Sequence, residues 1–531
     1  MAKNIFTKII IAILLLSMML SLAVACGDSE TTTTKPAVTN PPVSEETEDP
    51  DEAEDTTMPE STTAAPALKV EYPAQLQGIK DDLEDNRVQF IYVEGEEGFY
   101  TAKSLWVDEE TAGELDAVDQ QTIDRNNRVY EDLGITIEPF TDNTLSISGL
   151  YTFAKTYFDV QDPGLDVYCG FQYYDLKTAL TGNIMNLNTI VNENQETIID
   201  ITQPYWATNY INSITYNDYL FWVTGDLSLR YTGGLYCTFV NLDLYDAFVR
   251  SNYDNKSIYD IVNEKKWTMQ TMLDMADMAD FDSNADGKLS ADERIGILWR
   301  TGDILDGIPF GCKINYSNRT TSAGKDTISI ALPTDERATK LAGYIASFFD
   351  AHYAYRSDFN GMLPIFANGN ALFTFEKLYR SSIDLYAMER FAIIPTPLLD
   401  ENQPEYGSGT HDGLTIFGIS KYSNCPLASA ATLELMAYYG YLLVTPTYIE
   451  SVLKGSETVH DPESIAMIDK IRAGFDSDFA AAWTEKIGEI TYMFRGENVL
   501  KYGSMIKTST RSWTSNLKKL LEDIESVASA Q

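Results

Sequence analysis

The chain has 531 residues, which is enough for two or three compact units of ordinary domain size. Hydrophobic residues make up 44% of it and aromatic residues 12%, as in a globular protein rather than a disordered one. With 39 basic and 79 acidic residues the formal net charge is −40, and so acidic a chain repels phosphate backbones and anionic lipid surfaces. Nucleic acid is thereby excluded as a partner.

The first residues are typical of an export signal. Lys3 and Lys8 form a basic start, an apolar run from Ile9 to Leu22 follows, and small residues then lead to Cys26. This pattern resembles a bacterial lipoprotein signal, in which a Cys after a small residue becomes the lipidated first residue of the mature protein. We therefore expect a signal peptide over residues 1–25 and a lipid on Cys26 that anchors the protein to the outer face of the cell membrane. The alternatives are a cleaved secretory signal without lipid and an uncleaved anchor, for which the apolar run is short.

Residues 26–67 are rich in Thr, Pro and acidic side chains and contain few large apolar ones. Such a segment cannot bury enough surface to offset the entropy of ordering it, and its like charges extend it. We expect a disordered tether that holds the folded part away from a surface.

The folded part opens with strand and helix patterns that alternate. In chain order they are a strand at Arg87–Val93, a helix at Ala117–Leu133, a strand at Ile135–Phe140, a helix at Leu150–Phe158 and a strand at Leu165–Cys169. Strands that alternate with helices at this spacing predict an α/β sheet with crossover connections.

A polar, glycine-rich segment at Gly225–Gly234 is interpreted as a crossing into a second unit. That unit is predicted to begin with a strand at Leu235–Val240, a Met-rich helix at Gln270–Met278 and a strand at Arg294–Trp299. The C-terminal third adds strands at Ala371–Phe375 and Phe391–Pro397 and helices at Asp335–Phe349, at Leu427–Tyr439 and from Pro462 onwards.

The stretch from Asp282 to Glu293 specifies a chemistry more narrowly than any other. Ca²⁺ prefers oxygen ligands, and a twelve-residue loop supplies them from alternate positions and from its last residue. These positions hold Asp282, Asn284, Asp286, the Lys288 carbonyl, Ser290 and Glu293. Gly287 stands where such a loop has to turn sharply. We predict a structural Ca²⁺ site, and the alternative is a polar turn that happens to be acidic.

The calcium loop occurs once and leads into a predicted strand. A dockerin needs two such loops in tandem, and a calcium sensor has helices on both sides of each loop. The single copy and the strand exit therefore speak against a dockerin and against a calcium-regulated sensor.

Cysteine and histidine offer no metal or catalytic pattern. Apart from Cys26, the cysteines are widely spaced: Cys169, Cys237, Cys312 and Cys425. They could form up to two disulfides in an exported protein, but two of them lie in strand-like apolar runs, which favours buried thiols. The histidines do not stand at metal-ligand spacing from one another: His352, His411 and His460.

Several short stretches between about residues 86 and 480 form a pattern together. They are Asn127–Ile135, Leu165–Gly170, Ser257–Val262 with Lys266–Thr268, the calcium loop with Arg294–Gly296, Phe366–Phe373, and Pro395–Pro397 followed by Glu401–Gln403 and Tyr406. In this order and spacing they resemble the extracellular solute-binding proteins of bacterial ABC importers, above all the carbohydrate-binding lipoproteins of Gram-positive bacteria. A single calcium loop in the second lobe also occurs in such proteins.

The resemblance implies a two-lobe periplasmic-binding-protein-like fold of type II, in which two α/β lobes joined by hinge strands close on a ligand. By analogy the solute-binding domain spans residues 68–531, with lobe one at 68–230 and 398–450 and lobe two at 231–397 and 451–531. The resemblance also implies a monomer that captures a small ligand, which we expect to be an oligosaccharide, and delivers it to the permease subunits of an ABC transporter.

Candidate ligand-binding residues follow from the rule that ligands of open α/β sheets sit at the carboxyl ends of the strands. The positions after predicted strands, at the crossing and near the return to the first unit are Phe171, Gln172, Tyr173, Arg230, Tyr231, Phe375, Tyr379, His411 and Asp412. Aromatic faces stack on pyranose rings while polar groups bond the hydroxyls. For each single aromatic side chain the alternative is ordinary core packing.

Two other functions are compatible with parts of the sequence. A secreted glycan-active hydrolase needs two carboxylates about 5–10 Å apart, which the 79 acidic residues could supply, although nucleophile-elbow, zinc-type and phosphate-loop motifs are absent from the sequence. A binding protein for a peptide or a polyamine would use the same fold for a different ligand. We predict ligand binding without catalysis.

Overall fold

The computed structural model describes residues 70–93, 105–107, 113–140, 146–410, 413–453 and 462–530. The predicted signal peptide, the lipidation site Cys26 and the tether lie outside the described residues. The contacts between residues separate Met1–Leu68 from a unit formed by Lys69–Gln531, which contains all the elements described below.

The first sheet has four strands in the order β11-β3-β1-β2. Strand β1 (Arg87–Ile91) pairs in parallel with β2 (Thr136–Phe140) and with β3 (Val167–Phe171). Strand β11 (Thr415–Ile419) runs antiparallel to β3. Beyond β11 an antiparallel bridge joins Phe417 to Val223, so a fifth segment continues the sheet.

The second sheet has five strands in the order β10-β4-β9-β5-β8. Strand β5 (Ile295–Trp299) pairs in parallel with β8 (Ala354–Arg356) and β9 (Ala371–Lys377). Strand β4 (Tyr236–Asn241) runs antiparallel to β9 and to β10 (Phe391–Ile394).

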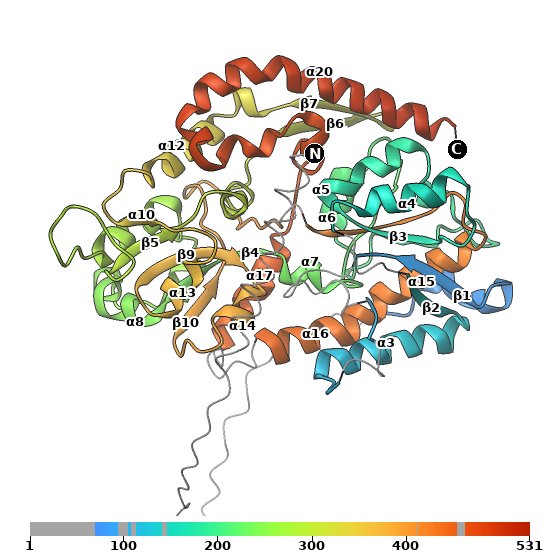
Figure 1. Cartoon of the computed structure of the whole chain (residues 1–531), viewed down its shortest axis with the longest axis horizontal. Helices are drawn as coiled ribbons and strands as arrows, with labels where there is room; N and C mark the ends of the chain where they lie inside the picture. Colours follow the sequence, from blue (N-terminus) through green and yellow to red (C-terminus); the bar gives the residue numbers. More distant parts are fainter. Residues whose placement is uncertain are drawn as a thin grey trace, which may run out of the picture. The chain divides into compact units, whose positions relative to one another are not determined.

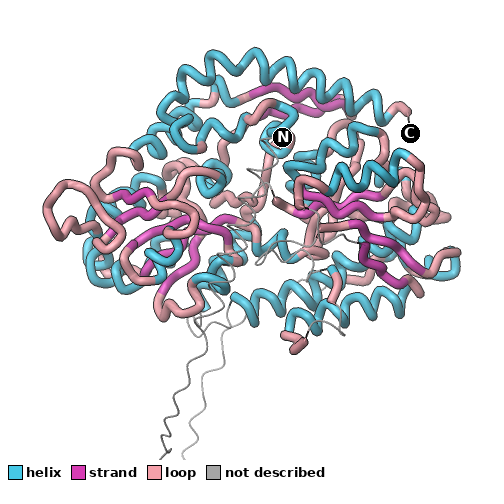
Figure 2. The backbone as a smooth tube through the Cα atoms, viewed as in Figure 1, coloured by secondary structure: helices cyan, strands magenta, loops and turns pink. Residues whose placement is uncertain are grey.

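The two sheets share one topology. In each, three parallel strands lie in the order second, first, third, and the next neighbour is an antiparallel strand that the chain enters from the other sheet (Figure 1). The chain leaves the first sheet through α7 (Leu229–Gly233) into β4 and returns through residues 398–414 into β11. Figure 2 shows the strands of these two sheets in two separate groups with helices around each. This arrangement confirms the predicted two-lobe α/β fold with chain crossings between the lobes.

Capping residues explain where several helices begin. Asp116 accepts hydrogen bonds from Val118 N and Asp119 N in a capping box at the start of α3 (Ala117–Leu133), and Gly134 ends that helix with a φ of 72°. The hydroxyl groups of Ser257 and Thr268 accept hydrogen bonds from backbone N–H groups at the start of α9 (Ile258–Asn263) and α10 (Met269–Ala279). The strands and longer helices predicted from the sequence agree with the observed ones to within about two residues at most ends.

The other helices of at least six residues are α4 (Leu150–Asp159), α6 (Thr208–Ile214), α12 (Glu336–Ser347), α13 (Met362–Ala367), α15 (Pro426–Tyr439), α17 (Pro462–Ala473) and α20 (Tyr502–Ala528). Shorter ones are α5 (Gln172–Asp175), α8 (Leu242–Leu244), α11 (Gly307–Gly311), α14 (Arg380–Asp384), α16 (Thr445–Thr447), α18 (Phe479–Ala482) and α19 (Thr484–Ile487). A hairpin, β6 (Ser317–Ser322) with β7 (Lys325–Ile330), forms a separate two-stranded sheet.

Helix α20 and strand β6 contact elements of both lobes. Helix α20 packs against β7 and α12 and also against the 3₁₀ turn Leu176–Thr181 of the first lobe. Arg319 of β6 donates to the carbonyls at the end of α6, namely Asn212 O, Ser213 O and Thr215 O. Helix α20 and strand β6 therefore connect elements of the two lobes.

One helical stretch among the described residues, Pro426–Glu450, is long and apolar enough to cross a membrane, but 78% of its apolar window is buried within the protein. Its first part, α15, packs against α3, β1 and β11, so it is a core helix. The four cysteines outside the N-terminal region are free and buried, as the sequence favours: Cys169, Cys237, Cys312 and Cys425.

Candidate functional site

The carboxyl ends of the parallel strands in both sheets lie beside the chain crossings. Tyr236, the first residue of β4, pairs with Lys377 at the end of β9, and Thr415, the first residue of β11, pairs with Phe171 at the end of β3. Because β4 and β11 both begin directly after a crossing, the two carboxyl edges meet the segments that join the lobes. This is where open α/β sheets place their ligands.

Three of the predicted ligand-binding residues come together at the first crossing. The guanidinium of Arg230 lies 4.8 Å from the centre of the Phe171 ring, and the backbone N–H of Tyr379 donates to Gly233 O in α7. Arg230 is 7% exposed, and burial lowers its pKa to about 9. One residue from each strand end and one from the crossing thus form a continuous group.

The turn after β3 is held by a buried carboxylate. Asp175 accepts hydrogen bonds from Tyr168 Oη at 2.6 Å and from Phe171 N at 2.7 Å. Gln172 continues the sheet by donating its backbone N–H to Leu414 O, and the Tyr173 hydroxyl donates to Glu489 Oε1 at 2.7 Å. Tyr173 therefore faces a segment from the C-terminal part of the chain.

The second-lobe edge carries a buried network of charges. Arg300, the residue after β5, lies 2.7 Å from Asp303 and 3.4 Å from Glu376, and Lys377 lies 2.9 Å from Asp303. Burial lowers the pKa of Lys377, but the carboxylates of Glu376 and Asp303 outweigh this effect and raise it. Fixed charges of both signs are therefore available beside the strand ends.

A pocket of about 540 Å³ opens next to this network. It is lined by residues after β5, by residues at the end of β8 and by two residues of the C-terminal part: Arg300, Thr301, Arg356, Ser357, Asp358, Phe359, Gly496 and Glu497. Phe359 is 60% exposed, and the guanidinium groups of Arg300 and Arg380 lie 5.0 Å and 5.7 Å from its ring centre. The exposed part of the Phe359 ring is therefore an aromatic surface available to a ligand, with two guanidinium groups beside it.

The segment after α19, from Glu489 to Arg495, contacts both lobes. Glu489 accepts from Tyr173 of the first lobe, while Arg495 Nε donates to Asp306 Oδ1 of the second lobe at 2.7 Å. The Arg495 guanidinium also lies 3.9 Å from the centre of the Tyr492 ring. The segment is therefore a third component of the candidate site.

Two predicted residues lie elsewhere. The sequence places Phe375 after a strand, but β9 extends to Lys377, so Phe375 pairs with Thr238 inside the sheet and is 1% exposed. Tyr231 packs against Phe475, with ring centres 5.3 Å apart, and against the Arg472 guanidinium. His411 and Asp412 lie outside the described residues. Phe375 and Tyr231 are therefore packed side chains in this structure.

The predicted calcium loop connects α10 to β5, so the expected strand exit is present. An antiparallel bridge between Phe281 and Arg294 closes its ends, with Phe281 N donating to Arg294 O at 2.8 Å. Ala285 and Gly287 adopt left-handed backbone conformations, with φ of 57° and 81°.

Hydrogen bonds within the loop fix its acidic side chains. Asp282 accepts from Ala285 N and Gly287 N, both at 2.7 Å, and Asp286 accepts from Lys288 N at 2.9 Å. Glu293 accepts from Ser283 Oγ and Ser283 N at 2.8 Å and from Ser290 N at 2.9 Å. These bonds, that of the Ser283 hydroxyl first, lower the pKa of Glu293 to about 2. Carboxylates fixed in a tight loop with carbonyl and hydroxyl oxygens are the donor set that Ca²⁺ prefers, so the residues fit this ion.

No family model and no curated protein matches the sequence. Solved structures similar to the chain include the GacH receptor of Streptomyces glaucescens GLA.O, determined unliganded and with acarbose, at 12% identity and a TM-score of 0.48. Others are maltose-bound MalE3 of T. maritima, at 12% and 0.45, and the ABC substrate-binding protein Lmo0181 of Listeria monocytogenes with cycloalternan, at 10% and 0.47. Each similarity covers 82% of this chain and at least 98% of the other.

Sequence reasoning missed the pocket and the C-terminal segment. The strand β8 is only three residues long, so no strand is predicted before Phe359. Arg495 contacts Asp306, which is 189 residues away in the sequence, and no local pattern indicates such a contact. The charged residues Arg300 and Asp303 come soon after the predicted strand Arg294–Trp299. They are the local signal that could have indicated a site at the carboxyl edge of the second sheet.

Proposed function

We propose that the protein is an extracellular solute-binding protein that captures an oligosaccharide and delivers it to the permease subunits of an ABC importer. It acts as a monomer, and a lipid on Cys26 anchors it to the outer face of the cell membrane. The observation that carries the proposal is the pair of sheets with the same strand order, whose carboxyl edges both meet the chain crossings. Such an arrangement lets two lobes approach each other around one ligand.

The side chains at these edges suit a sugar. Phe359, Tyr173 and Tyr379 are aromatic groups that can stack on the apolar faces of pyranose rings. Arg300, Asp303 and Lys377 hold one another in place and offer donors and acceptors to ring hydroxyls without having to be ordered on binding.

A thermal-shift screen over oligosaccharides tests the proposal. A ligand at 100 times its dissociation constant should add about 2.7 kcal/mol to the free energy of unfolding. The same screen should include peptides and polyamines, and released reducing ends should be assayed in the sugar samples. Stabilisation by peptides or polyamines alone would overturn the proposed sugar ligand. Release of reducing ends would overturn the proposed absence of catalysis.

Replacing Phe359 by alanine should weaken binding of the stabilising oligosaccharide about tenfold, or about 1.4 kcal/mol, because it removes a stacking surface without removing core packing. Isothermal titration measures the dissociation constant. The control is Tyr130→Ala, which removes an aromatic side chain that is 56% exposed on α3 and should leave affinity unchanged. Equal affinities for Phe359→Ala and wild type would exclude the pocket from the binding site.

We also propose that the loop Asp282–Glu293 binds Ca²⁺ as a structural ion. The ion would hold the end of α10 to the start of β5, so removing it should lower the melting temperature while leaving sugar affinity largely unchanged below the transition. At Ca²⁺ about 100 times its dissociation constant, the loss is about 2.7 kcal/mol. Asp282→Ala should show this loss without chelator, whereas Asp292→Asn, beside the predicted ligand Glu293, should behave as wild type. Loss of sugar binding by a still-folded protein in EDTA would contradict a structural role.

A further inference from the structure

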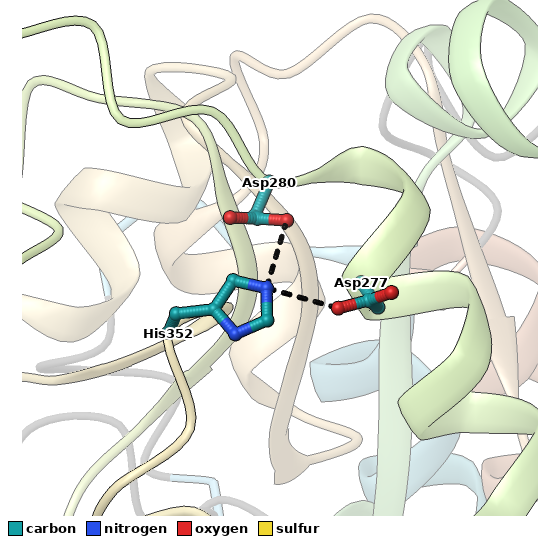
Figure 3. Close-up of side chains that lie close together, drawn as sticks. All are labelled: Asp277, Asp280 and His352. Atoms are coloured by element: carbon teal, nitrogen blue, oxygen red, sulfur yellow. Dashed lines mark ion pairs between the residues drawn. The ribbon is translucent and has the colours of Figure 1, made fainter. Parts of the chain in front are cut away.

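A second group of metal-ligating side chains lies beside the calcium loop. Among the described residues, Asp277, Asp280 and His352 place one ligand atom each within 4.8 Å of one another. Figure 3 shows the imidazole of His352 directed at both carboxylates, with Nε2 2.9 Å from Asp277 Oδ1 and 3.9 Å from Asp280 Oδ1.

The backbone that carries these side chains is fixed by the core. Asp277 lies in the last turn of α10 and Asp280 directly follows its last residue, so the two carboxylates stand three residues apart at the end of the helix. Helix α10 lies against β5 so closely that a Cβ on Gly296 would come within 2.3 Å of Ala276 O. Tyr353, next to His352, accepts from Gly296 N and Ile297 N at 3.0 Å and 2.9 Å. The close contact of α10 and β5 therefore brings His352 to the two acids.

The spacing of the ligand atoms fits a single ion. Zn²⁺ binds His nitrogen and carboxylate oxygen at about 2.0–2.2 Å, so two ligand atoms at a tetrahedral angle lie about 3.4 Å apart. The two distances from His352 Nε2, 2.9 Å and 3.9 Å, lie on either side of this value. Small movements of the side chains are enough, and Asp277 and His352 can make them because they are 57% and 66% exposed.

The ligand types separate this group from the calcium loop. Two carboxylates and an imidazole suit Zn²⁺ and similar divalent transition metals, whereas the all-oxygen loop suits Ca²⁺. From this geometry we propose that Asp277, Asp280 and His352 form a binding site for a divalent transition metal of the Zn²⁺ type, with water completing the coordination. Asp280 lies two residues before the loop begins, so this ion fixes the point where α10 passes into the calcium loop.

The test is a titration of the full chain with ZnCl₂, measured by isothermal titration calorimetry. Excess Ca²⁺ is present so that the calcium loop is occupied. Wild type should bind one Zn²⁺, and His352→Gln should bind it at least about tenfold more weakly. Asp277→Asn should be weakened in the same way, and both changes lie on exposed side chains that do not hold the core. His460→Gln is the matched control, because it removes another histidine of the chain, and it should bind as wild type.

Two results would overturn the site. One is that wild type binds no Zn²⁺, or binds it as well as His352→Gln does, which would leave a surface ion pair of little energetic weight. The other is that Asp282→Asn loses Zn²⁺ binding while His352→Gln keeps it, which would place the metal in the loop.

Discussion

Replacing Arg472 by methionine should lower the free energy of unfolding by about 3–5 kcal/mol, because it leaves a buried carboxylate without its counter-ion. Asp226 has a side chain that is 0% exposed, and Arg472 Nη2 donates to its two oxygens at 2.8 Å and 3.1 Å. Thr445 Oγ1 donates to the same carboxylate at 2.8 Å. Burial raises the pKa of Asp226, and the Arg472 guanidinium opposes that rise. Methionine fills a similar volume and supplies no charge.

Urea unfolding curves measure the loss. Arg87→Met is the control, since Arg87 pairs with Glu138 at 2.8 Å on the surface, with side chains 50% and 43% exposed. That change should cost less than about 1 kcal/mol. Adding Asp226→Asn to Arg472→Met should restore part of the stability, because it removes the unpaired charge. Equal losses for Arg472→Met and Arg87→Met would show that Asp226 is not held by its counter-ion.

The position of this pair connects stability with the proposed function. Asp226 stands where the chain leaves the first lobe for α7, Thr445 follows the core helix α15, and Arg472 lies on α17, which packs against β10 of the second lobe. Three separate chain segments are thus held at one point beside the crossing. Gly440 allows this contact, since a Cβ there would come within 2.1 Å of Asp226 O. Changes at this point should therefore affect the approach of the lobes as well as unfolding.

The fold could be predicted because its signals are local. Several helices begin at a capping residue, such as Asp116 before α3 and Thr268 before α10, and strands such as β3, β5 and β9 are short, buried, mostly apolar runs. The hairpin β6–β7 was missed because its strands are polar and mostly exposed, which gives no alternation of apolar and polar residues. Its position depends on Arg319 and the end of α6, a contact that no local pattern encodes.

The sequence located the ends of β3 and β9 only to within two residues, and this error had a different effect on each candidate residue. Strand β3 runs two residues past its predicted end, so Phe171 is its last residue, and the ring still lies 4.8 Å from the Arg230 guanidinium at the first crossing. Phe375 lies two residues before the end of β9 and is buried within the sheet, because β9 runs to Lys377. Phe359 and Arg495 belong to the region through contacts between distant segments. The calcium loop is contiguous in sequence, so its geometry was accessible, whereas Asp280 and His352 come from different elements.

A change of Glu434 to glutamine should alter how stability depends on pH. Glu434 is 0% exposed and accepts from Tyr205 Oη at 2.6 Å, Trp206 Nε1 at 3.0 Å and Asp200 N at 3.2 Å. Burial nevertheless raises its pKa from 4.5 to about 8, since desolvation outweighs these donors. The folded state therefore holds a proton that the unfolded state releases at lower pH.

This difference in proton binding determines whether the free energy of unfolding rises or falls with pH. Below about pH 4.5 Glu434 is protonated in both the folded and the unfolded state, and the stability that its protonated form gives to the fold is fully present. Between about pH 4.5 and 8 the unfolded state loses this proton first, so the free energy of unfolding falls as the pH rises, by at most about 1.4 kcal/mol per pH unit. Glutamine cannot ionise, so the difference in free energy of unfolding between wild type and Glu434→Gln should change across this window. Urea unfolding at several pH values measures it. Glu522→Gln, on a side chain of α20 that is 63% exposed, should run parallel to wild type. A difference between Glu434→Gln and wild type that is constant across this window would mean that the pKa of Glu434 is not raised in the fold, and that its hydrogen-bond donors at least offset burial.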